Sequence, residues 1–251
     1  MPEGDAVHRA ARRLQALVGE ELDVETPHPR AAVKHLAPVL DGRRLESVHA
    51  VGKNLLLRFE GGVVLRNHMR MKGRWRVLPR HAEIYGTPWL VLRGEQYVGV
   101  LSGGAVLELD HGQPLRVGPD ILGEPPDFDA MLRNLRATEQ TREVGDALLA
   151  QYLIAGIGNV WKIESLWAVG VSPWRPLADV TDDELRAILA EAHRLMKASL
   201  DGEPGRRNVY RRKGHACPRC GTPIRSWPQG EGARMAYWCP QCQRGKEPRT
   251  K

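Results

Sequence analysis

The spacing of apolar residues divides the 251-residue chain into a short helical start, a strand-rich region and a second helical region. In the first 18 residues, apolar positions recur every three or four residues, which predicts an amphipathic helix beginning at Asp5. From residue 22 to 118 the pattern alternates, as in Leu55, Leu57 and Phe59 before the Gly61-Gly62 turn. Further short runs are LVLRG, QYVGV and AVLELD. This pattern predicts an antiparallel β-sandwich with the N-terminal helix laid against it.

Residues 130–200 return to helical spacing. Thr181 and Glu184 form a capping-box pattern that predicts a helix start. Upstream, TREVGDALLAQYLIAGIGNVWKIESLW predicts two helices joined by the turn Gly156–Asn159. The glycines let the backbone approach a partner closely, and the N-terminus of the following helix attracts phosphate, to which Asn159 adds a side-chain donor. An ordinary turn with Asn159 as the helix cap is the alternative.

The four cysteines form two Cys-x-x-Cys pairs separated by 18 residues near the C-terminus: Cys217, Cys220, Cys239 and Cys242. This spacing is typical of a tetrahedral structural zinc site. His215 is a possible substitute ligand, although four thiolates already close the site. Residues 222–227 and 234–238 flank the turn PQGEG, which predicts a zinc-stabilised hairpin that presents Arg234 to phosphate.

The charge of the chain is concentrated in its C-terminal part. The formal net charge is +7, but residues 206–251 contain 12 Lys and Arg against 2 Glu. Clustered bases favour a polyanion partner, foremost nucleic acid, over a merely solvated tail. No run approaches the roughly 18 apolar residues of a membrane span, and the first 22 residues lack the apolar core of a secretory signal. The composition therefore predicts a soluble, cytoplasmic protein, with a monomer as the default.

Three other stretches carry candidate chemistry. If Met1 is removed from MPEGD, Pro2 becomes a free secondary amine beside the Glu3 carboxyl group. Lys53, in VGKN, lies at the end of a predicted strand, where the alternative is a solvated turn lysine. Met71 lies among bases in NHMRMKGR, so its side chain could enter a base stack while the bases hold phosphates; ordinary core packing is the competing interpretation.

Together, MPEGD, VGKNLLL, NHMRMKGRW, AGIGNVW and the paired-cysteine segment resemble the formamidopyrimidine/endonuclease VIII family of DNA glycosylases over nearly the whole chain and in the family's order. The PEGD opening is more similar to the endonuclease VIII branch. The resemblance implies an α+β multidomain fold with a β-sandwich, a helix-two-turns-helix domain and a zinc finger. We expect the boundaries at residues 1–118 for the sandwich, 119–129 for a linker, 130–205 for the helical domain and 206–251 for the finger.

The resemblance also implies roles for individual residues. By motif position, Pro2 is the nucleophile, Glu3 the acid and Lys53 a phosphate-binding catalytic lysine. Asn159 and Arg234 are phosphate ligands, and Met71 lies where the family inserts a void-filling residue into the duplex. The family usually has Glu at the position of Asp5.

The expected activity is that of a bifunctional glycosylase and abasic-site lyase acting on damaged double-stranded DNA, with oxidised pyrimidines as substrates. A secondary amine can expel the base by attack at C1′, and the resulting iminium permits β-elimination and then δ-elimination. An N-terminal amine has a pKa near 8, so much of it is neutral at physiological pH. The alternatives are the same chemistry on oxidised purines and a non-catalytic zinc-ribbon DNA-binding protein.

Overall fold

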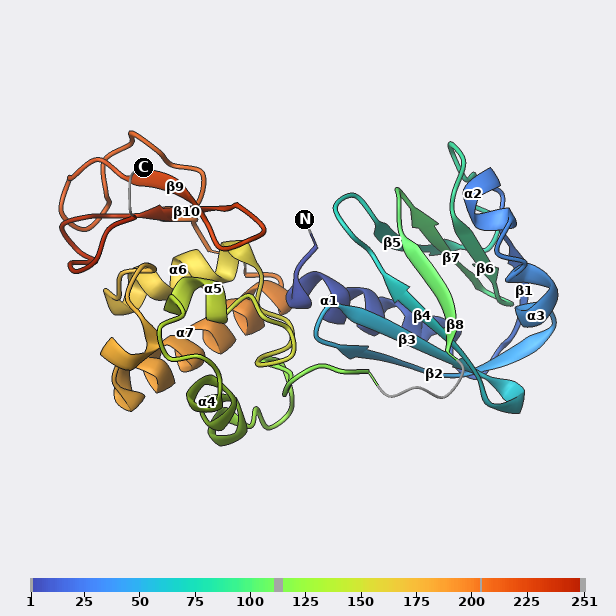
Figure 1. Ribbon diagram of the computed structural model, residues 1–251. Helices are drawn as coiled ribbons and strands as arrows, with labels where there is room; N and C mark the ends of the chain where they lie inside the picture. Colours follow the sequence, from blue (N-terminus) through green and yellow to red (C-terminus); the bar gives the residue numbers. More distant parts are fainter. Residues whose placement is uncertain (1, 111–114, 204, 249–251) are drawn as a thin grey trace. The chain divides into compact units, whose positions relative to one another are not determined.

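The computed structural model describes residues 2–110, 115–203 and 205–248, and the chain forms two compact units, Met1–Leu115 and Arg116–Lys251 (Figure 1). In the described part of the chain, no helix has both the length and the apolar character that a membrane span requires. The elements of the first unit, with η for a 3₁₀-helix, are α1 (Gly4–Leu14), η1 (Gln15–Leu17), β1 (Glu21–Glu25), α2 (Pro29–Ala32), α3 (Ala37–Leu40), β2 (Arg43–Val51), β3 (Asn54–Phe59), η2 (Glu60–Gly62), β4 (Val63–His68), β5 (Arg74–Pro79), β6 (Leu90–Arg93), β7 (Tyr97–Ser102) and β8 (Val106–Asp110).

The strands of the first unit are antiparallel and follow the order β5-β7-β6-β1-β2-β3-β4-β8. Strand β1 joins the two halves, because Glu21 and Leu22 pair with β2 whereas residues 23–25 pair with β6. The predicted hairpin is β3 and β4, and its alternating residues Leu55, Leu57 and Phe59 are fully buried. The predicted sandwich is therefore confirmed, with one shared strand linking its halves.

Helix α1 packs against β2, β3 and β5 and buries its apolar face in the same core. It begins at Gly4 instead of Asp5. The reason is that the Glu3 carbonyl accepts hydrogen bonds from the N–H groups of Ala6 and Val7, at 3.0 and 3.2 Å, so Glu3 already occupies the N-cap position.

The second unit contains helices and a two-stranded hairpin. Its elements are α4 (Phe128–Ala137), α5 (Val144–Ala147), α6 (Asn159–Val169), η3 (Leu177–Asp179), α7 (Asp182–Leu200), β9 (Arg225–Gln229) and β10 (Arg234–Trp238). The capping box is confirmed at the start of α7: the Thr181 hydroxyl accepts from the Glu184 N–H, and the Glu184 carboxylate accepts from the Thr181 N–H. The buried face of α7 packs against α6 and α4.

Two predictions for this unit require correction. The helix predicted before Gly156 is only the single turn α5, because the Gln151 side chain hydrogen-bonds the Leu149 carbonyl, the Ile157 carbonyl and the Gly156 N–H and so holds the chain in turns. Residues 119–129, expected to be a linker, lie in the second unit. Ile121 and Leu122 are buried in its helical core, which a solvated linker would not allow.

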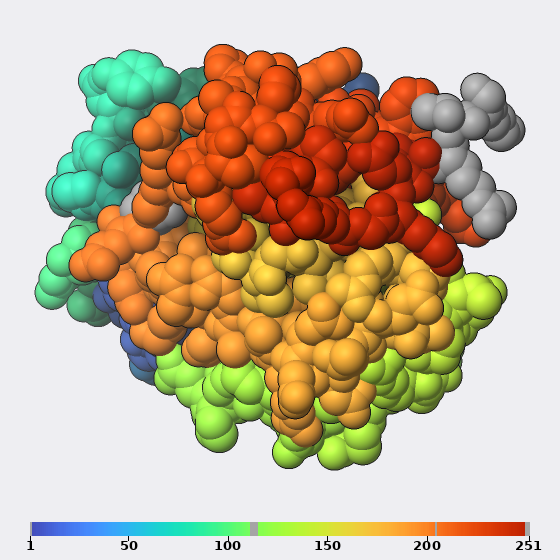
Figure 2. Space-filling view, turned by 90° about the vertical axis from the view of Figure 1, so that its left-hand side faces the viewer, coloured from blue at the N-terminus to red at the C-terminus, as the bar shows by residue number. Residues whose placement is uncertain are grey.

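The hairpin packs on α6. Ile163 of α6 contacts a small cluster with Val209, Ile224 and two of the cysteines, and in Figure 2 the orange-to-red finger lies over the yellow helical residues. Strand β9 includes Pro228 and Gln229, which the sequence pattern assigned to the turn. Proline is tolerated there because each strand of a two-stranded hairpin has a free edge.

Candidate catalytic, DNA-binding and metal-binding residues

Pro2 and Glu3 lie at the start of α1, a helix that buries one face in the core of the first unit. Pro2 is half-buried and Glu3 is only 3% exposed. Asp5 is also buried and forms an ion pair with Arg9, with 3.5 Å between oxygen and nitrogen. Asp5 can therefore serve the first turn of α1 in place of a glutamate, since an acid there also matches the positive end of the helix dipole. The structure gives the N-terminal segment a fixed base instead of a frayed end.

Lys53 lies in a tight turn beside a group of basic residues. Gly52 has a φ of 58°, which lets the chain reverse between β2 and β3. Asn54 pairs with His68, so the end of β4 lies next to this turn. Burial is the largest cause that lowers the pKa of His68, and the positive charges of Lys53 and Arg70 lower it further. The imidazole is therefore neutral at physiological pH within a positively charged cluster suited to phosphate.

His68 is a site residue that no motif in the sequence indicates. Its Nδ1 accepts a hydrogen bond from the Arg70 N–H at 3.1 Å, which leaves Nε2 to carry the proton of the neutral ring. The only available signal was its position at the end of a predicted strand, and the cross-strand register with Asn54 could not be read from the pattern.

Met71 is exposed on the loop between β4 and β5. Its side chain is 61% exposed, so the interpretation of Met71 as a core residue is wrong. The neighbouring Met69, only 3% exposed, is the methionine of this loop that packs in the core. The loop is tight: the Gly73 N–H donates to the Met69 carbonyl at 2.8 Å, and a Cβ on Gly73 would collide with that carbonyl. Met71 is thus displayed by a turn with little conformational freedom.

Asn159 and Arg234 come together within the second unit. Helix α6 begins at Asn159 with Gly158 as its N-cap, so the alternative in which Asn159 caps the helix is wrong. Instead, Asn159 Nδ2 donates to the Met235 carbonyl at 2.9 Å, next to Arg234. Asn159 Oδ1 is buried and has no hydrogen-bond partner among the described residues. Arg234 is exposed at the first position of β10.

A buried lysine also links α6 to the hairpin, a contact that the helical pattern of the sequence does not predict. Lys162 is fully buried, and its Nζ donates to Gln229 Oε1 at 3.2 Å. Gln229 lies opposite Arg234 in the hairpin and donates from Nε2 to Glu143 Oε2 at 2.9 Å and to the Pro173 carbonyl at 2.8 Å. Asn159 and Lys162, nearly one helical turn apart, therefore both fix the end of the hairpin that carries Arg234.

Replacing Lys162 with methionine should destabilise the second unit by about 1–3 kcal/mol, because the buried Gln229 amide loses its donor. Thermal unfolding followed by calorimetry measures this change. The control is Lys197→Met, which removes a lysine of α7 that is only partly buried and pairs with Asp201 at 2.7 Å; its effect should stay within about 0.5 kcal/mol. Equal effects of the two substitutions would show that the buried contact contributes nothing.

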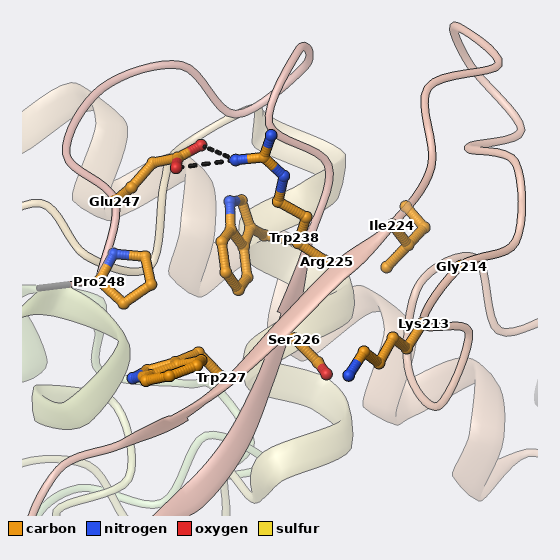
Figure 3. A pocket seen from close by; sticks show the side chains of 9 residues that line it. All are labelled: Lys213, Gly214, Ile224, Arg225, Ser226, Trp227, Trp238, Glu247 and Pro248. Carbon is orange, nitrogen blue, oxygen red and sulfur yellow. Dashed lines mark hydrogen bonds and ion pairs between the residues drawn. The ribbon is translucent and has the colours of Figure 1, made fainter. Parts of the chain in front are cut away.

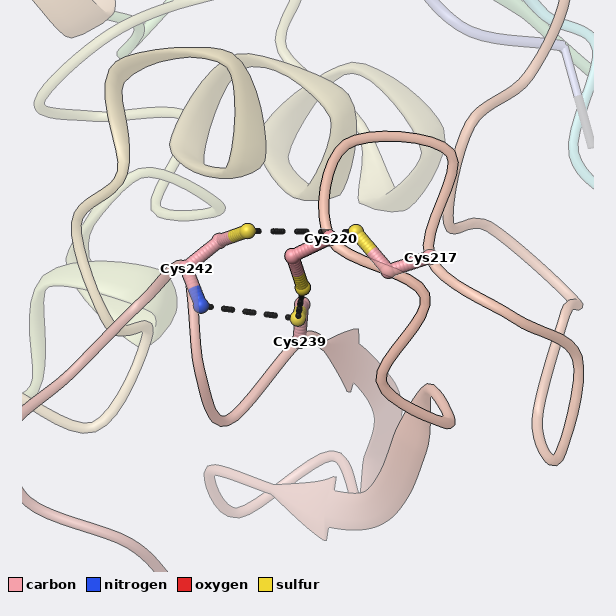
Figure 4. A group of neighbouring side chains, drawn as sticks. All are labelled: Cys217, Cys220, Cys239 and Cys242. Atoms are coloured by element: carbon pink, nitrogen blue, oxygen red, sulfur yellow. Dashed lines mark hydrogen bonds between the residues drawn. The ribbon is translucent and has the colours of Figure 1, made fainter.

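The four cysteines form one cluster (Figure 4). Their sulfur atoms lie within 4.8 Å of one another, with 3.9 Å between Cys217 and Cys242 and 3.4 Å between Cys220 and Cys239. A tetrahedral zinc with bonds of about 2.3 Å requires sulfur separations of about 3.8 Å. His215 is exposed and lies outside this cluster. The four-thiolate set therefore fits a tetrahedral metal ion, and His215 is not needed as a ligand.

The thiols differ in acidity according to their surroundings. Hydrogen bonds with the side chain and backbone of Thr222 lower the pKa of Cys220 to about 6. Burial raises the pKa of Cys239 and Cys242. Four thiolates at these separations repel one another, so a divalent cation is needed to hold all four in the deprotonated state that ligates metal.

Family models match most of the chain. The formamidopyrimidine-DNA glycosylase N-terminal domain matches residues 1–116, and the formamidopyrimidine-DNA glycosylase H2TH domain matches residues 117–209. The chain is 37% identical to a Streptomyces coelicolor protein described as probable endonuclease 8 2, over 99% of this chain and 96% of that relative. It is 34% identical to the formamidopyrimidine-DNA glycosylase of Thermus thermophilus, over 97% of this chain and 98% of that relative.

The fold is also similar to solved structures. A crystal structure of Lactococcus lactis Fpg in complex with DNA that contains N7-benzyl-Fapy-dG matches with a TM-score of 0.82 and 23% identity, over 97% of this chain and 100% of that chain. The family matches favour an enzyme over the non-catalytic zinc-ribbon protein. The chain belongs to the formamidopyrimidine-DNA glycosylase/endonuclease VIII family and is a DNA glycosylase and abasic-site lyase of base excision repair.

Proposed function

We propose that this glycosylase excises oxidised pyrimidines from duplex DNA, with Pro2 as its nucleophile once Met1 has been removed. The observation that carries the catalytic assignment is the N-terminal geometry, in which a half-buried Pro2 is followed by a Glu3 that is only 3% exposed. A buried carboxyl group next to the amine is positioned to act as a general acid. The PEGD opening and the 37% identity to a probable endonuclease 8 2 support pyrimidines as substrates.

In the proposed reaction, the Pro2 nitrogen attacks C1′ of the damaged nucleotide and the base leaves with the bond electrons and a proton. Glu3 protonates the sugar ring oxygen as the C1′–O bond opens, giving a cationic iminium between Pro2 and C1′. Loss of a C2′ proton then expels the 3′ phosphate, a second elimination expels the 5′ phosphate, and water releases Pro2. Neither elimination requires an oxidant, and the products are the free base, an unsaturated five-carbon aldehyde from the sugar and a one-nucleotide gap with a phosphate at each end.

The remaining residues are assigned to DNA binding and structure. Lys53, with His68 beside it, and the pair Asn159 and Arg234 would hold phosphates around the flipped nucleotide, which fixes C1′ relative to the amine. Met71 is exposed and apolar, as a side chain that enters the vacated stack must be. Zn²⁺ is the proposed metal of the four-cysteine cluster, where it would stabilise the hairpin without taking part in the chemistry.

Borohydride trapping on an abasic-site duplex tests the nucleophile. We expect a covalent adduct, located on Pro2 by mass spectrometry of the N-terminal peptide. An adduct on a lysine, or none with fully processed protein, would contradict the assignment.

A panel of duplexes separately tests the substrate. Duplexes with 5-hydroxyuracil or thymine glycol should be cleaved faster than duplexes with 8-oxoguanine opposite cytosine. The reverse order would favour oxidised purines, which the similarity to a formamidopyrimidine-DNA glycosylase makes the second candidate.

A further inference from the structure

The finger contains a pocket that none of the proposed roles uses. It has a volume of about 300 Å³ and lies at the end of the hairpin away from the turn, between β9 and the segments before and after the cysteine pairs (Figure 3). Residues of both strands and of both flanking segments line it, including Lys213, Arg225, Trp227, Trp238 and Glu247. Its volume is at the lower end of the range for small-molecule sites.

Two tryptophans form an aromatic surface in this pocket. Trp227 pairs with Ala236 and Arg225 pairs with Trp238, so the two indoles are diagonal neighbours on one face of the hairpin. Trp227 is 42% exposed, which leaves a large apolar ring in contact with water, whereas Trp238 is 2% exposed. An exposed indole face next to a cavity is suited to stacking a flat ring.

The polar groups of the pocket are suited to a ligand that carries a hydrogen-bond acceptor and a negative charge. Trp238 Nε1 is buried and has no hydrogen-bond partner among the described residues. In Figure 3 this nitrogen lies on the same side as Arg225 and Glu247, which are joined by contacts of 2.7 and 2.8 Å. Lys213 is exposed and forms no ion pair with a described residue, whereas the carboxylate of Glu247 pairs with Arg225. Among the described residues, the pocket thus offers an indole N–H without an acceptor and a lysine without an ion pair.

We propose that this pocket binds an unpaired nucleobase together with its phosphate. The base stacks on Trp227, a carbonyl or ring nitrogen of the base accepts the Trp238 N–H, and Lys213 contacts the phosphate. Arg234 lies four residues before Trp238 on β10, about 13 Å away along the strand. A DNA strand held by Arg234 therefore passes within reach of the pocket. That the ligand belongs to a DNA strand rests on the proposed function, whereas the binding of a nucleotide by the pocket does not.

Binding of thymidine 3′,5′-bisphosphate, followed by calorimetry and tryptophan fluorescence, tests the pocket. The matched probe is the same bisphosphate with a tetrahydrofuran ring that lacks the base. We expect the thymidine form to bind more tightly, and Trp227→Leu to weaken it on the order of 10-fold to 100-fold. Lys213→Met should weaken both probes and reduce the salt dependence by about one ion. Equal binding of the two probes, or no effect of Trp227→Leu, would overturn the proposal.

Further measurements separate failure of the pocket from failure of the fold or of the proposed function. Trp227→Leu should retain metal content and abasic-site trapping, whereas Pro2→Gly should lose trapping and keep nucleotide binding. Trp89→Leu, in the first unit where the indole stacks on His28, is the matched tryptophan control and should leave binding unchanged. Pentathymidylate should compete with the bisphosphate; without competition, the DNA strand is excluded as the ligand. A truncated chain that ends at Pro248 is compared with the full chain. If only the truncated chain binds the bisphosphate, the proposal that the pocket of the full chain binds a nucleotide is wrong.

Discussion

Replacing Pro2 with glycine is expected to reduce strand cleavage and borohydride trapping on the order of 10³-fold or more, with DNA affinity retained. Glycine still allows Met1 removal, but its primary amine lacks the ring that fixes the nitrogen lone pair at the start of α1. A short N-terminal extension that keeps Pro2 in an amide removes the nucleophile entirely and should abolish trapping. Single-turnover cleavage of an abasic duplex, beside a binding assay, measures both effects.

Glu3→Gln tests the neighbouring acid in the same assays. Loss of the proton donor should slow base excision by about 10²–10⁴-fold, while the preformed abasic site, which has no base to expel, should be affected less. Glu21→Gln, at an exposed position of β1, is the matched control and should cleave at the wild-type rate. If Pro2→Gly and Glu3→Gln both cleaved like this control, the proposed catalytic roles would be wrong.

Removal of the metal is expected to unfold the finger. Structural zinc sites contribute about 10–16 kcal/mol of apparent binding free energy at pH 7, far more than a two-stranded hairpin can supply by itself. Cys239→Ser, or extraction with a strong chelator, should therefore release one metal ion per chain and lower DNA affinity at least about 100-fold as Arg234 loses its fixed position. Metal analysis, circular dichroism and a binding titration measure these changes.

The same experiment has internal controls in both units. His215→Ala should keep the metal, because the four sulfurs alone complete the cluster. Thermal unfolding of the first unit should be unchanged, since none of the described residues of its core belongs to the finger. A Cys239→Ser protein that retains one ion per chain and wild-type affinity would contradict the four-thiolate assignment.

Elements with strong local signals were predictable from the sequence. The capping box at Thr181, the hairpin around Gly61 and the paired cysteines each depend on residues close together in the chain, where spacing and turn chemistry decide the structure. The position of Met71 outside the core was left open, because a methionine among bases is compatible with either environment.

The contacts that depend on distant segments were not predictable. A lysine in a helical pattern is normally placed on the solvent face, yet Lys162 is fully buried because Gln229, 67 residues later, accepts its hydrogen bond. Similarly, the shortness of α5 results from the Gln151 side chain, which competes with the helix for backbone groups. The tryptophan pocket depends on the register of β9 and β10, which the predicted turn placed too early.

The tight turn that displays Met71 has a consequence for how quickly lesions can be found. Because Gly73 closes the loop onto the Met69 carbonyl, the backbone that carries Met71 is already turned, and less backbone entropy has to be lost when the side chain meets a base pair. For the proposed insertion of Met71, the rate of interrogation is then set by the opening of the DNA itself. Damaged base pairs, which stack weakly, would open first, so that the stability of the DNA duplex itself would decide where Met71 inserts.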